Sequence, residues 1–322
     1  MEKFISRRQV LKVLSSAGMA SPFLSPWDLE KWLRVSGTMD KVDDQTEKIL
    51  NRTIPSTGEQ LPVIGLGTWQ QFDVGTSPSE RDPLLQILEM MIEKGSKVID
   101  SSPMYGRSEA VVGDLTGKTD DPDHFFYATK VWTRGRQSGI DQMNASFSGM
   151  NREKMDLMQI HNLVDWKTHL KTLLDWKSQG KVRYIGITHY TDSSHDSLED
   201  IVRNQPVDFV QFNYSIRERN AEKTLLDACG EAGVAVIINS PYEGGSLFGL
   251  VKNKPLPDWA QDYNIESWGQ YFLKFILSHP AVTCVIPGTS RPDHALDNLG
   301  AGVGPIPDQN AKEKMVEYIN SL

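Results

Sequence analysis

The sequence predicts an α/β protein of the (β/α)8 or TIM-barrel class, with an N-terminal β-hairpin. Eight short apolar runs alternate with eight amphipathic segments between residues 63 and 299. Strands separated by helices pair in parallel, and closure into a barrel leaves such a sheet without exposed edges. An open doubly wound sheet would carry a glycine-rich turn after its first strand. Residues 65–67 supply only G-x-G, without a third glycine or an immediate helix.

The elements begin with a hairpin signal in residues 52–66, where Ser56, Thr57 and Gly58 separate two short extended runs. Local signals set later boundaries: a helical pattern starts at Ser108 and ends at Gly117. The predicted strands are 63–67, 97–102, 125–131, 155–161, 182–188, 208–214, 234–240 and 283–287. The predicted helices lie near 80–94, 108–117, 140–151, 167–179, 193–203, 221–232, 265–278 and 292–299.

Composition narrows the possible functions of the 322-residue chain. Its hydrophobic fraction of 39% is enough for a sizeable core. The formal net charge of -8 and the absence of a basic cluster argue against nucleic acid as a partner. Cys229 and Cys284 have no metal-ligand spacing and form no disulfide framework, so we expect buried thiols and no metal site.

The first 45 residues differ in character from the rest of the chain. Residues 6–12 read SRRQVLK, and a moderately apolar run too short to span a bilayer follows. This segment resembles a twin-arginine (Tat) signal peptide, with Arg7 and Arg8 as the arginine pair. We therefore expect a signal peptide and linker in 1–45, a barrel domain in 46–322, and a periplasmic protein exported by the Tat machinery without a membrane span. The alternative is a disordered basic arm or surface helix on a cytoplasmic protein.

Four chemically active side chains fall at or just after the ends of neighbouring predicted strands. Asp100 ends the second strand, Tyr105 follows in the next turn, Lys130 ends the third strand and His161 ends the fourth. The carboxyl ends of barrel strands form the rim where active sites lie. Each residue alone fits a structural ion pair or a satisfied core histidine. An ammonium at the end of an apolar strand needs a carboxylate partner, which Asp100 can supply, and together the four predict an active site.

At this point the sequence resembles the aldo-keto reductase superfamily over roughly residues 52–300. The matching segments are GLGTW at 65–69, D-x4-YG-x-SE at 100–109, ATK at 128–130, QIHN at 159–162, IGITHY at 185–190, QFNYS at 211–215 and IPGTSRP-x4-DN at 286–298. The resemblance implies that Tyr105 gives a proton to a carbonyl whose carbon receives hydride from a nicotinamide. Lys130 then lowers the proton affinity of the phenol, Asp100 anchors the lysine, and His161 orients the carbonyl or relays a proton.

The resemblance also implies NADP as the cofactor. Thr188, His189 and Gln211 occupy the places that hold the carboxamide, with His189 instead of the usual asparagine. Asn239 replaces the usual stacking aromatic ring, which leaves Tyr214 or Tyr242 for that role. A pyrophosphate loop is expected at 240–247, a 2'-phosphate pocket at 288–291 and adenine contacts beyond it. The expected cofactor-binding residues are Gly67, Thr68, Trp69, Asp100, Thr188, His189, Gln211, Ser240, Tyr242, Gly244, Leu247, Gly288, Thr289, Ser290, Arg291, Asp297 and Asn298.

The sequence thus predicts an NADP(H)-dependent reductase of aldehydes or ketones. Trp69, Phe72, Trp132 and Tyr190 are expected to form an apolar mouth that admits the small carbonyl substrate. The alternative is a nicotinamide-binding regulatory or sensor subunit with little turnover, a reading that His189 and Asn239 favour and that the complete set of four residues disfavours. An unrelated barrel isomerase or lyase fits the closing nucleotide-binding segment poorly.

Overall fold

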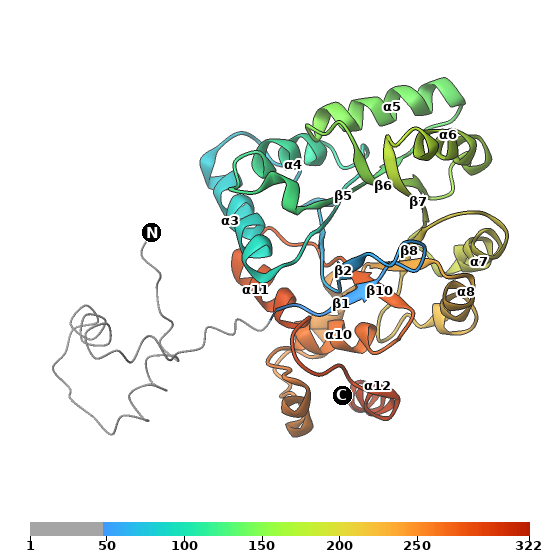
Figure 1. The fold of residues 1–322 in the computed structure, drawn as a ribbon. Helices are drawn as coiled ribbons and strands as arrows, with labels where there is room; N and C mark the ends of the chain where they lie inside the picture. Colours follow the sequence, from blue (N-terminus) through green and yellow to red (C-terminus); the bar gives the residue numbers. More distant parts are fainter. Residues whose placement is uncertain (1–47) are drawn as a thin grey trace. The chain divides into compact units, whose positions relative to one another are not determined.

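The computed structural model describes residues 48–322, so the predicted signal peptide lies outside the described residues. Eight parallel strands form one sheet in sequence order, and a ring of helices surrounds them (Figure 1). The strands are β3 (Leu66–Gly67), β4 (Val98–Asp100), β5 (Phe126–Val131), β6 (Met155–His161), β7 (Val182–Thr188), β8 (Phe209–Asn213), β9 (Ala235–Asn239) and β10 (Val282–Val285). All eight predicted strands are therefore present.

Backbone contacts between the first and last strands close the sheet. Parallel bridges join Ile64 to Val285 and Gly67 to Gly288, and the Val285 amide donates to the Val63 carbonyl at 2.9 Å. A Cβ atom on Gly67 would lie 2.8 Å from the Ile286 carbonyl oxygen, so only glycine permits this approach. The barrel prediction is confirmed.

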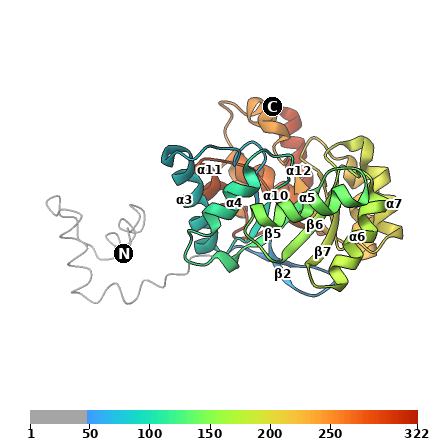
Figure 2. The same cartoon turned by 90° about the horizontal axis from the view of Figure 1, so that it is seen from above.

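The predicted hairpin closes the N-terminal end of the barrel. Its strands β1 (Asn51–Thr53) and β2 (Gln60–Pro62) pair antiparallel, and β2 lies at one end of the barrel in the side view (Figure 2). Ile54 and Leu61 belong to a buried cluster with residues from the first halves of the barrel strands, including Phe126 and Phe209. The hairpin therefore fills the end of the barrel opposite the carboxyl ends of the strands.

Arg52 ties this hairpin to the last part of the barrel. Its guanidinium donates to the carbonyl of Leu277 at 2.5 Å and to that of His279 at 2.9 Å, and it also reaches the Val282 carbonyl. These carbonyls lie at the end of one helix and the start of the next strand. One side chain thus serves as a partner for backbone groups that have none within the helix.

The ring of helices matches the prediction with shifts at the ends. Figure 2 shows α4, α5 and α6 covering strands β5, β6 and β7 from outside. The ring comprises α3 (Pro78–Lys94), α4 (Ser108–Thr116), α5 (Arg136–Gly149), α6 (Trp166–Ser178), α7 (His195–Asn204), α8 (Leu225–Ala232), α10 (Trp268–Leu277) and α11 (Pro292–Gly300).

Two further helices were not predicted. The short α9 (Ser246–Leu250) begins at the end of the predicted pyrophosphate loop, and α12 (Gln309–Ser321) is the C-terminal helix. Asp308 caps α12 by accepting a hydrogen bond from the Ala311 amide at 2.8 Å. The Tyr271 hydroxyl donates to the Met315 carbonyl at 3.0 Å, which docks α12 on α10.

Both cysteines are free and buried, as predicted. Within residues 48–322, every helix is too short or too polar to cross a membrane.

Candidate active site

The structure brings Asp100, Tyr105, Lys130 and His161 together at the carboxyl ends of β4, β5 and β6. The Lys130 ammonium donates to Asp100 Oδ2 at 2.6 Å and to the Ser101 carbonyl at 2.7 Å. The Tyr105 ring lies over this ammonium, with 4.9 Å between the ring centroid and Nζ. The same ring meets His161 edge-on at a centroid distance of 5.9 Å. The four residues thus form one contiguous cluster.

The Lys130–Asp100 ion pair is fully inside the protein. The side chains of Lys130 and Asp100 are 0% and 3% exposed. Burial acts to lower the pKa of Lys130, but Asp100 and then Tyr105 outweigh it, so the pKa is raised. The lysine is therefore a permanent cation beneath the phenol.

Tyr105 is held in its protonated form. Burial raises its pKa above the ordinary value, the Lys130 charge lowers it and the Asp100 charge raises it. We expected Lys130 to dominate, but burial outweighs it because the hydroxyl has lost most of its water. The phenol is consequently a proton donor at neutral pH, and the ammonium is positioned to stabilise a phenolate once the proton has left.

His161 is a neutral imidazole. Burial, then the charges of Lys130 and His189, lower its pKa to about 3. Its Nδ1 lies 3.1 Å from the Ser102 hydroxyl oxygen. A neutral ring can orient a carbonyl by hydrogen bonding, which agrees with the first of the two predicted roles, whereas a relay through an imidazolium would require a charge that this environment disfavours.

Two glutamines extend the cluster through hydrogen bonds to Asp100. Gln159 on β6 and Gln211 on β8 each donate from Nε2 to Asp100 Oδ1 at 2.9 Å. Thr188 donates to Gln211 Oε1 at 3.1 Å, so both ends of this amide, predicted to hold a carboxamide, already have protein partners. Gln159 was missed by the sequence reasoning. Its spacing of two residues from His161 on one strand was the available signal, because such residues share a face.

The predicted cofactor-binding residues lie on the same rim. They occupy the ends of β3, β4 and β7, the middle of β8, the loops after β3, β7, β9 and β10, and helices α9 and α11. Thr68 is fully buried and donates from Oγ1 to the Asp100 carbonyl at 3.0 Å. Trp69 is exposed beside it, and Leu247 is fully buried, so Leu247 has only backbone to offer a ligand.

The two departures from the family pattern contact each other. Asn239 Nδ2 donates to the His189 carbonyl at 3.2 Å, and the His189 ring stacks on Tyr190 with 5.5 Å between centroids. Among residues 48–322 the buried Asn239 Oδ1 has no hydrogen-bond partner. It is therefore a buried acceptor without a protein partner at the end of β9.

The segment after β9 contains several residues in left-handed backbone conformations, which is compatible with the predicted pyrophosphate loop. Ser240, Gly244 and Gly245 have φ values of 49°, 66° and 95°, and left-handed residues of this kind turn successive backbone amides toward one point. The Tyr242 hydroxyl donates to Asn298 Oδ1 at 2.6 Å. Tyr214, the other candidate for ring stacking, is fully buried in the core, so Tyr242 is the better placed of the two.

The last predicted segment follows β10 and contains Gly288, Thr289, Ser290 and Arg291. Arg291 is exposed and paired twice with Asp293, from Nε at 3.1 Å and from Nη2 at 2.6 Å. Asp297 accepts from Ser267 Oγ at 2.6 Å and from Gln270 at 2.9 Å. The guanidinium thus already has one anionic partner, with which a phosphate would have to compete.

Three of the four predicted mouth residues are on the surface. Trp69, Trp132 and Tyr190 are 57%, 42% and 59% exposed, and Trp132 lies 6.3 Å from the His161 ring. The prediction that Phe72 lines the mouth was wrong, because this side chain is 0% exposed and packs in the hydrophobic core. It therefore does not line a mouth.

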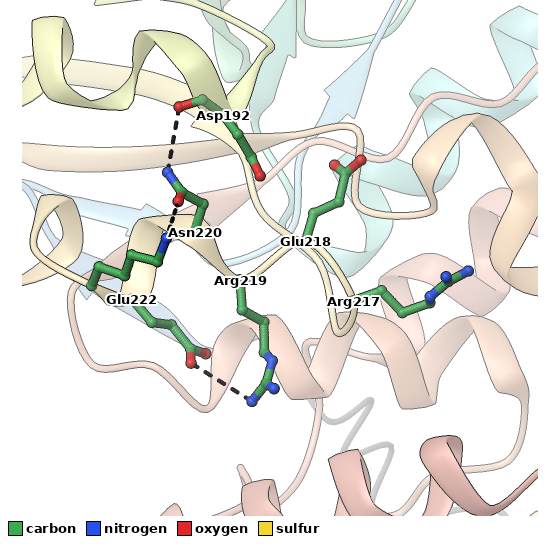
Figure 3. A pocket seen from close by; sticks show the side chains of 7 residues that line it. Asp192, Arg217, Glu218, Arg219, Asn220 and Glu222 are labelled. Carbon is green, nitrogen blue, oxygen red and sulfur yellow. Dashed lines mark hydrogen bonds and ion pairs between the residues drawn. The ribbon is translucent and has the colours of Figure 1, made fainter.

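A separate charged cavity of about 560 Å³ lies between the loops that follow β7 and β8. Figure 3 shows the contact between Asn220 and Asp192, with Arg219 turned toward Glu222. The Lys223 ammonium donates to Asn220 Oδ1 at 2.9 Å. None of the four clustered residues lines it. The lining residues are Asp192, Arg217, Glu218, Arg219, Asn220, Glu222 and Lys223. Within residues 48–322 there is no group of three or more His, Cys, Asp or Glu side chains that could hold a metal ion.

Comparison with known proteins identifies the family. The chain matches the aldo/keto reductase family model over residues 63–315. It is 29% identical over 247 residues to methylglyoxal reductase YeaE of Escherichia coli, covering 74% of this chain and 84% of the relative. It is 25% identical over 308 residues to an NADH-specific methylglyoxal reductase of the same organism, covering 76% and 91%.

Solved structures show the same fold. An aldo-keto reductase from Klebsiella pneumoniae in complex with NADPH superposes with a TM-score of 0.68 at 20% identity, covering 85% of this chain and 95% of that chain. An aldo-keto reductase from Bacillus halodurans gives a TM-score of 0.67 at 19% identity, covering 84% and 96%. Because the family model matches most of this chain, and the barrel and the four-residue cluster are in place, the chain belongs to the aldo/keto reductase family.

Proposed function

We propose that this protein reduces an aldehyde or ketone to an alcohol with NADP(H), and that Tyr105 is the general acid. The observation that carries the proposal is a partly buried, protonated phenol over a fully buried ammonium, beside a neutral imidazole. Membership in a family of oxidoreductases and similarity to two methylglyoxal reductases support the same reaction class.

The site residues fit a nicotinamide nucleotide. The unpartnered Asn239 Oδ1 and the left-handed turn at 240–245 offer an acceptor and converging amides on one rim. Thr188, His189 and Gln211 would hold the nicotinamide end, and Arg291 the 2'-phosphate end. When bound, the nucleotide supplies hydride to the carbonyl carbon.

The residues of the chain supply the proton and the positioning. His161 donates a hydrogen bond that orients the carbonyl oxygen, and Tyr105 Oη transfers its proton to that oxygen as the alcohol forms. The resulting phenolate lies over the Lys130 ammonium, which stabilises the negative charge in a region of low dielectric. Asp100 keeps the ammonium in place, and the phenolate regains a proton from solvent.

We infer a small carbonyl substrate. Trp69, Trp132 and Tyr190 are exposed aromatic side chains in the loops after β3, β5 and β7, and Trp132 lies next to His161. Relatives named as methylglyoxal reductases support an α-oxoaldehyde as the first compound to test.

Substrate assays with the purified protein test the proposed function. Oxidation of NADPH by a panel of aldehydes and ketones should be fast with the parent and reduced by at least about 100-fold in Tyr105→Phe, the lower end for a general acid. Binding of NADPH should be equal in both proteins. Turnover of Tyr105→Phe within about tenfold of the parent would overturn the assignment of Tyr105.

The same assay separates the second candidate, a nicotinamide-binding sensor with little turnover. Asn239 and His189 favour that candidate because no aromatic ring stacks from β9. Tight NADPH binding without turnover of any carbonyl in the panel would support the sensor.

We further propose export to the periplasm by the twin-arginine route, with the cytoplasm as the alternative location. The support is the pair Arg7 and Arg8 ahead of a short apolar run. This route accepts folded proteins, so the nucleotide would be acquired before export.

A further inference from the structure

We propose that Gln159 is a positioning residue of the catalytic centre. Its amide fixes the carboxylate of Asp100, which fixes the ammonium of Lys130 beneath Tyr105. The inference rests on the proposed function, because it concerns the same proton transfer.

The two oxygens of Asp100 have separate partners. Oδ2 accepts from Lys130 at 2.6 Å, and Oδ1 accepts from Gln159 and Gln211 at 2.9 Å each. The two amides come from β6 and β8 and hold Oδ1 from two directions. Rotation of the carboxylate about its Cβ–Cγ bond would break both amide hydrogen bonds, so Oδ2 stays directed at the ammonium.

The neighbouring strand leaves room for this glutamine. Gly186 on β7 is the register partner of Gln159. A Cβ atom at Gly186 would lie 2.9 Å from Gln159 Cγ and 3.3 Å from Leu157 Cδ1. A larger residue would therefore push Gln159 from its place.

Packing alone does not explain why position 159 carries an amide side chain. Gln159 is fully buried, and its Oε1 has no hydrogen-bond partner in the part of the chain that the structure describes. Burying an unpaired carbonyl oxygen is unfavourable, whereas a methionine of similar length would fill the space without that penalty. The donor bond to Asp100 is the benefit that the amide provides.

The proton affinity of Tyr105 links this bond to catalysis. Three charged or titratable side chains face the phenol: Lys130 from β5, Asp100 from β4 and His161 from β6. Lys130 lowers the pKa of Tyr105 and Asp100 raises it. Losing an amide donor leaves more of the Asp100 charge uncompensated and frees the lysine to shift. Both changes raise the pKa of the phenol.

The test compares Gln159→Met with the parent and with Thr283→Val. Thr283 accepts a hydrogen bond from the Val236 amide at 3.0 Å on the same sheet, so the control also removes a buried hydrogen bond. We expect Gln159→Met to lower kcat by about tenfold or more, the scale of a hydrogen bond to a charge. The basic limb of the kcat–pH profile should move to higher pH, with the melting temperature unchanged or raised. Thr283→Val should lower the melting temperature and leave kcat and the profile unchanged.

A structural role for Gln159 predicts the reverse pattern. A lower melting temperature with unchanged kcat and an unmoved basic limb would overturn the proposal. If Gln159→Met does not fold, Gly186→Ala displaces the same amide and should give the same loss of kcat and the same shift. A folded Gly186→Ala variant with the parent profile would then overturn it.

A readout without turnover separates this inference from the proposed function. The carbon-13 resonance of the Tyr105 Cζ atom, assigned by its absence in Tyr105→Phe, reports the electronic state of the phenol. It should move in Gln159→Met and stay in place in Thr283→Val, even if no carbonyl is reduced. If the resonance moves in Gln159→Met although the parent reduces no carbonyl, the positioning role is kept and the reductase is rejected. If the parent reduces carbonyls but the resonance does not move in Gln159→Met, the reductase is kept and the positioning role is rejected.

Discussion

Removing the charges of Lys130 and Asp100 one at a time should destabilise the fold by more, in sum, than removing both charges together. In Lys130→Met, the carboxylate of Asp100 stays buried without its cation. Breaking a buried pair at one partner costs about 3 to 5 kcal/mol. The two amides on Asp100 Oδ1 remain, so we expect the lower end, a loss of about 3 kcal/mol in the free energy of unfolding.

The double variant tests whether the stability effects of the two charges depend on each other. Asp100→Asn alone strands the ammonium and should also cost about 3 kcal/mol. Lys130→Met with Asp100→Asn removes both charges, so its loss should fall short of the sum of the single losses by at least about 2 kcal/mol. Carbonyl reduction should be lost in all three variants.

Urea unfolding near neutral pH, followed by tryptophan fluorescence, measures these free energies. Lys118→Met is the matched control, because Lys118 and its partner Asp114 are 52% and 41% exposed, and it should cost less than about 1 kcal/mol. Single losses that add up in the double variant would refute the reasoning that the two charges depend on each other.

Three further predictions concern the cofactor, pH and location. Arg291→Ala should reduce the preference for NADPH over NADH by about 1.5 to 3 kcal/mol, and Asp293→Asn should increase this preference because it frees Arg291. Calorimetric titration with both nucleotides measures the preference. Equal dissociation constants in the parent would contradict the assigned 2'-phosphate site. Because the pKa of His161 is lowered from 6.5 to about 3, its contribution to stability is present above pH 6.5 and is lost as the pH falls toward 3. His161→Asn should therefore reduce the fall in unfolding free energy between pH 6.5 and pH 3. An unchanged slope of unfolding free energy against pH would show that His161 is not the group responsible. Replacing Arg7 and Arg8 with lysine should retain the protein in the cytoplasm on cell fractionation, whereas identical distribution of parent and variant would contradict export.

The sequence predicted the barrel well because strand and helix patterns alternate with little ambiguity. The errors came from glycines and from short elements. A helix was expected near 140–151, yet α5 begins at Arg136 and contains Gly139. A Cβ atom on Gly139 would lie 2.4 Å from the His169 ring, so this glycine makes room for a neighbour inside the helix.

The helices that were missed have different causes. The five residues of α9 are too few to show a period. In α12 the buried residues Ala311, Met315 and Ile319 recur every fourth position behind the Asp308 cap, so this helix could have been predicted from its pattern.

In the site, the sequence identified which residues meet but not the strength of their interactions. The strand ends placed Asp100, Lys130 and His161 together, because parallel strands share a rim. The direction of the Tyr105 pKa depends on how much water the surrounding side chains exclude, which no local pattern reports. The burial of Phe72 likewise depends on residues distant in sequence.

The closure of the barrel has a consequence for the order in which the protein can fold. The cluster residues lie within 100–161, but Arg52 bonds to the carbonyl of His279, 227 residues later, and β3 meets β10 through Gly67 and Gly288. A nascent chain that ends before β10 therefore contains all four side chains of the proposed catalytic cluster and still lacks the strand that completes the ring. Contacts between such distant segments form late, because the entropy of closing a long loop must be overcome first. A ribosome-stalled chain ending near residue 250 should leave Lys130 open to lysine-modifying reagents, and protection should appear only after residue 288 has emerged.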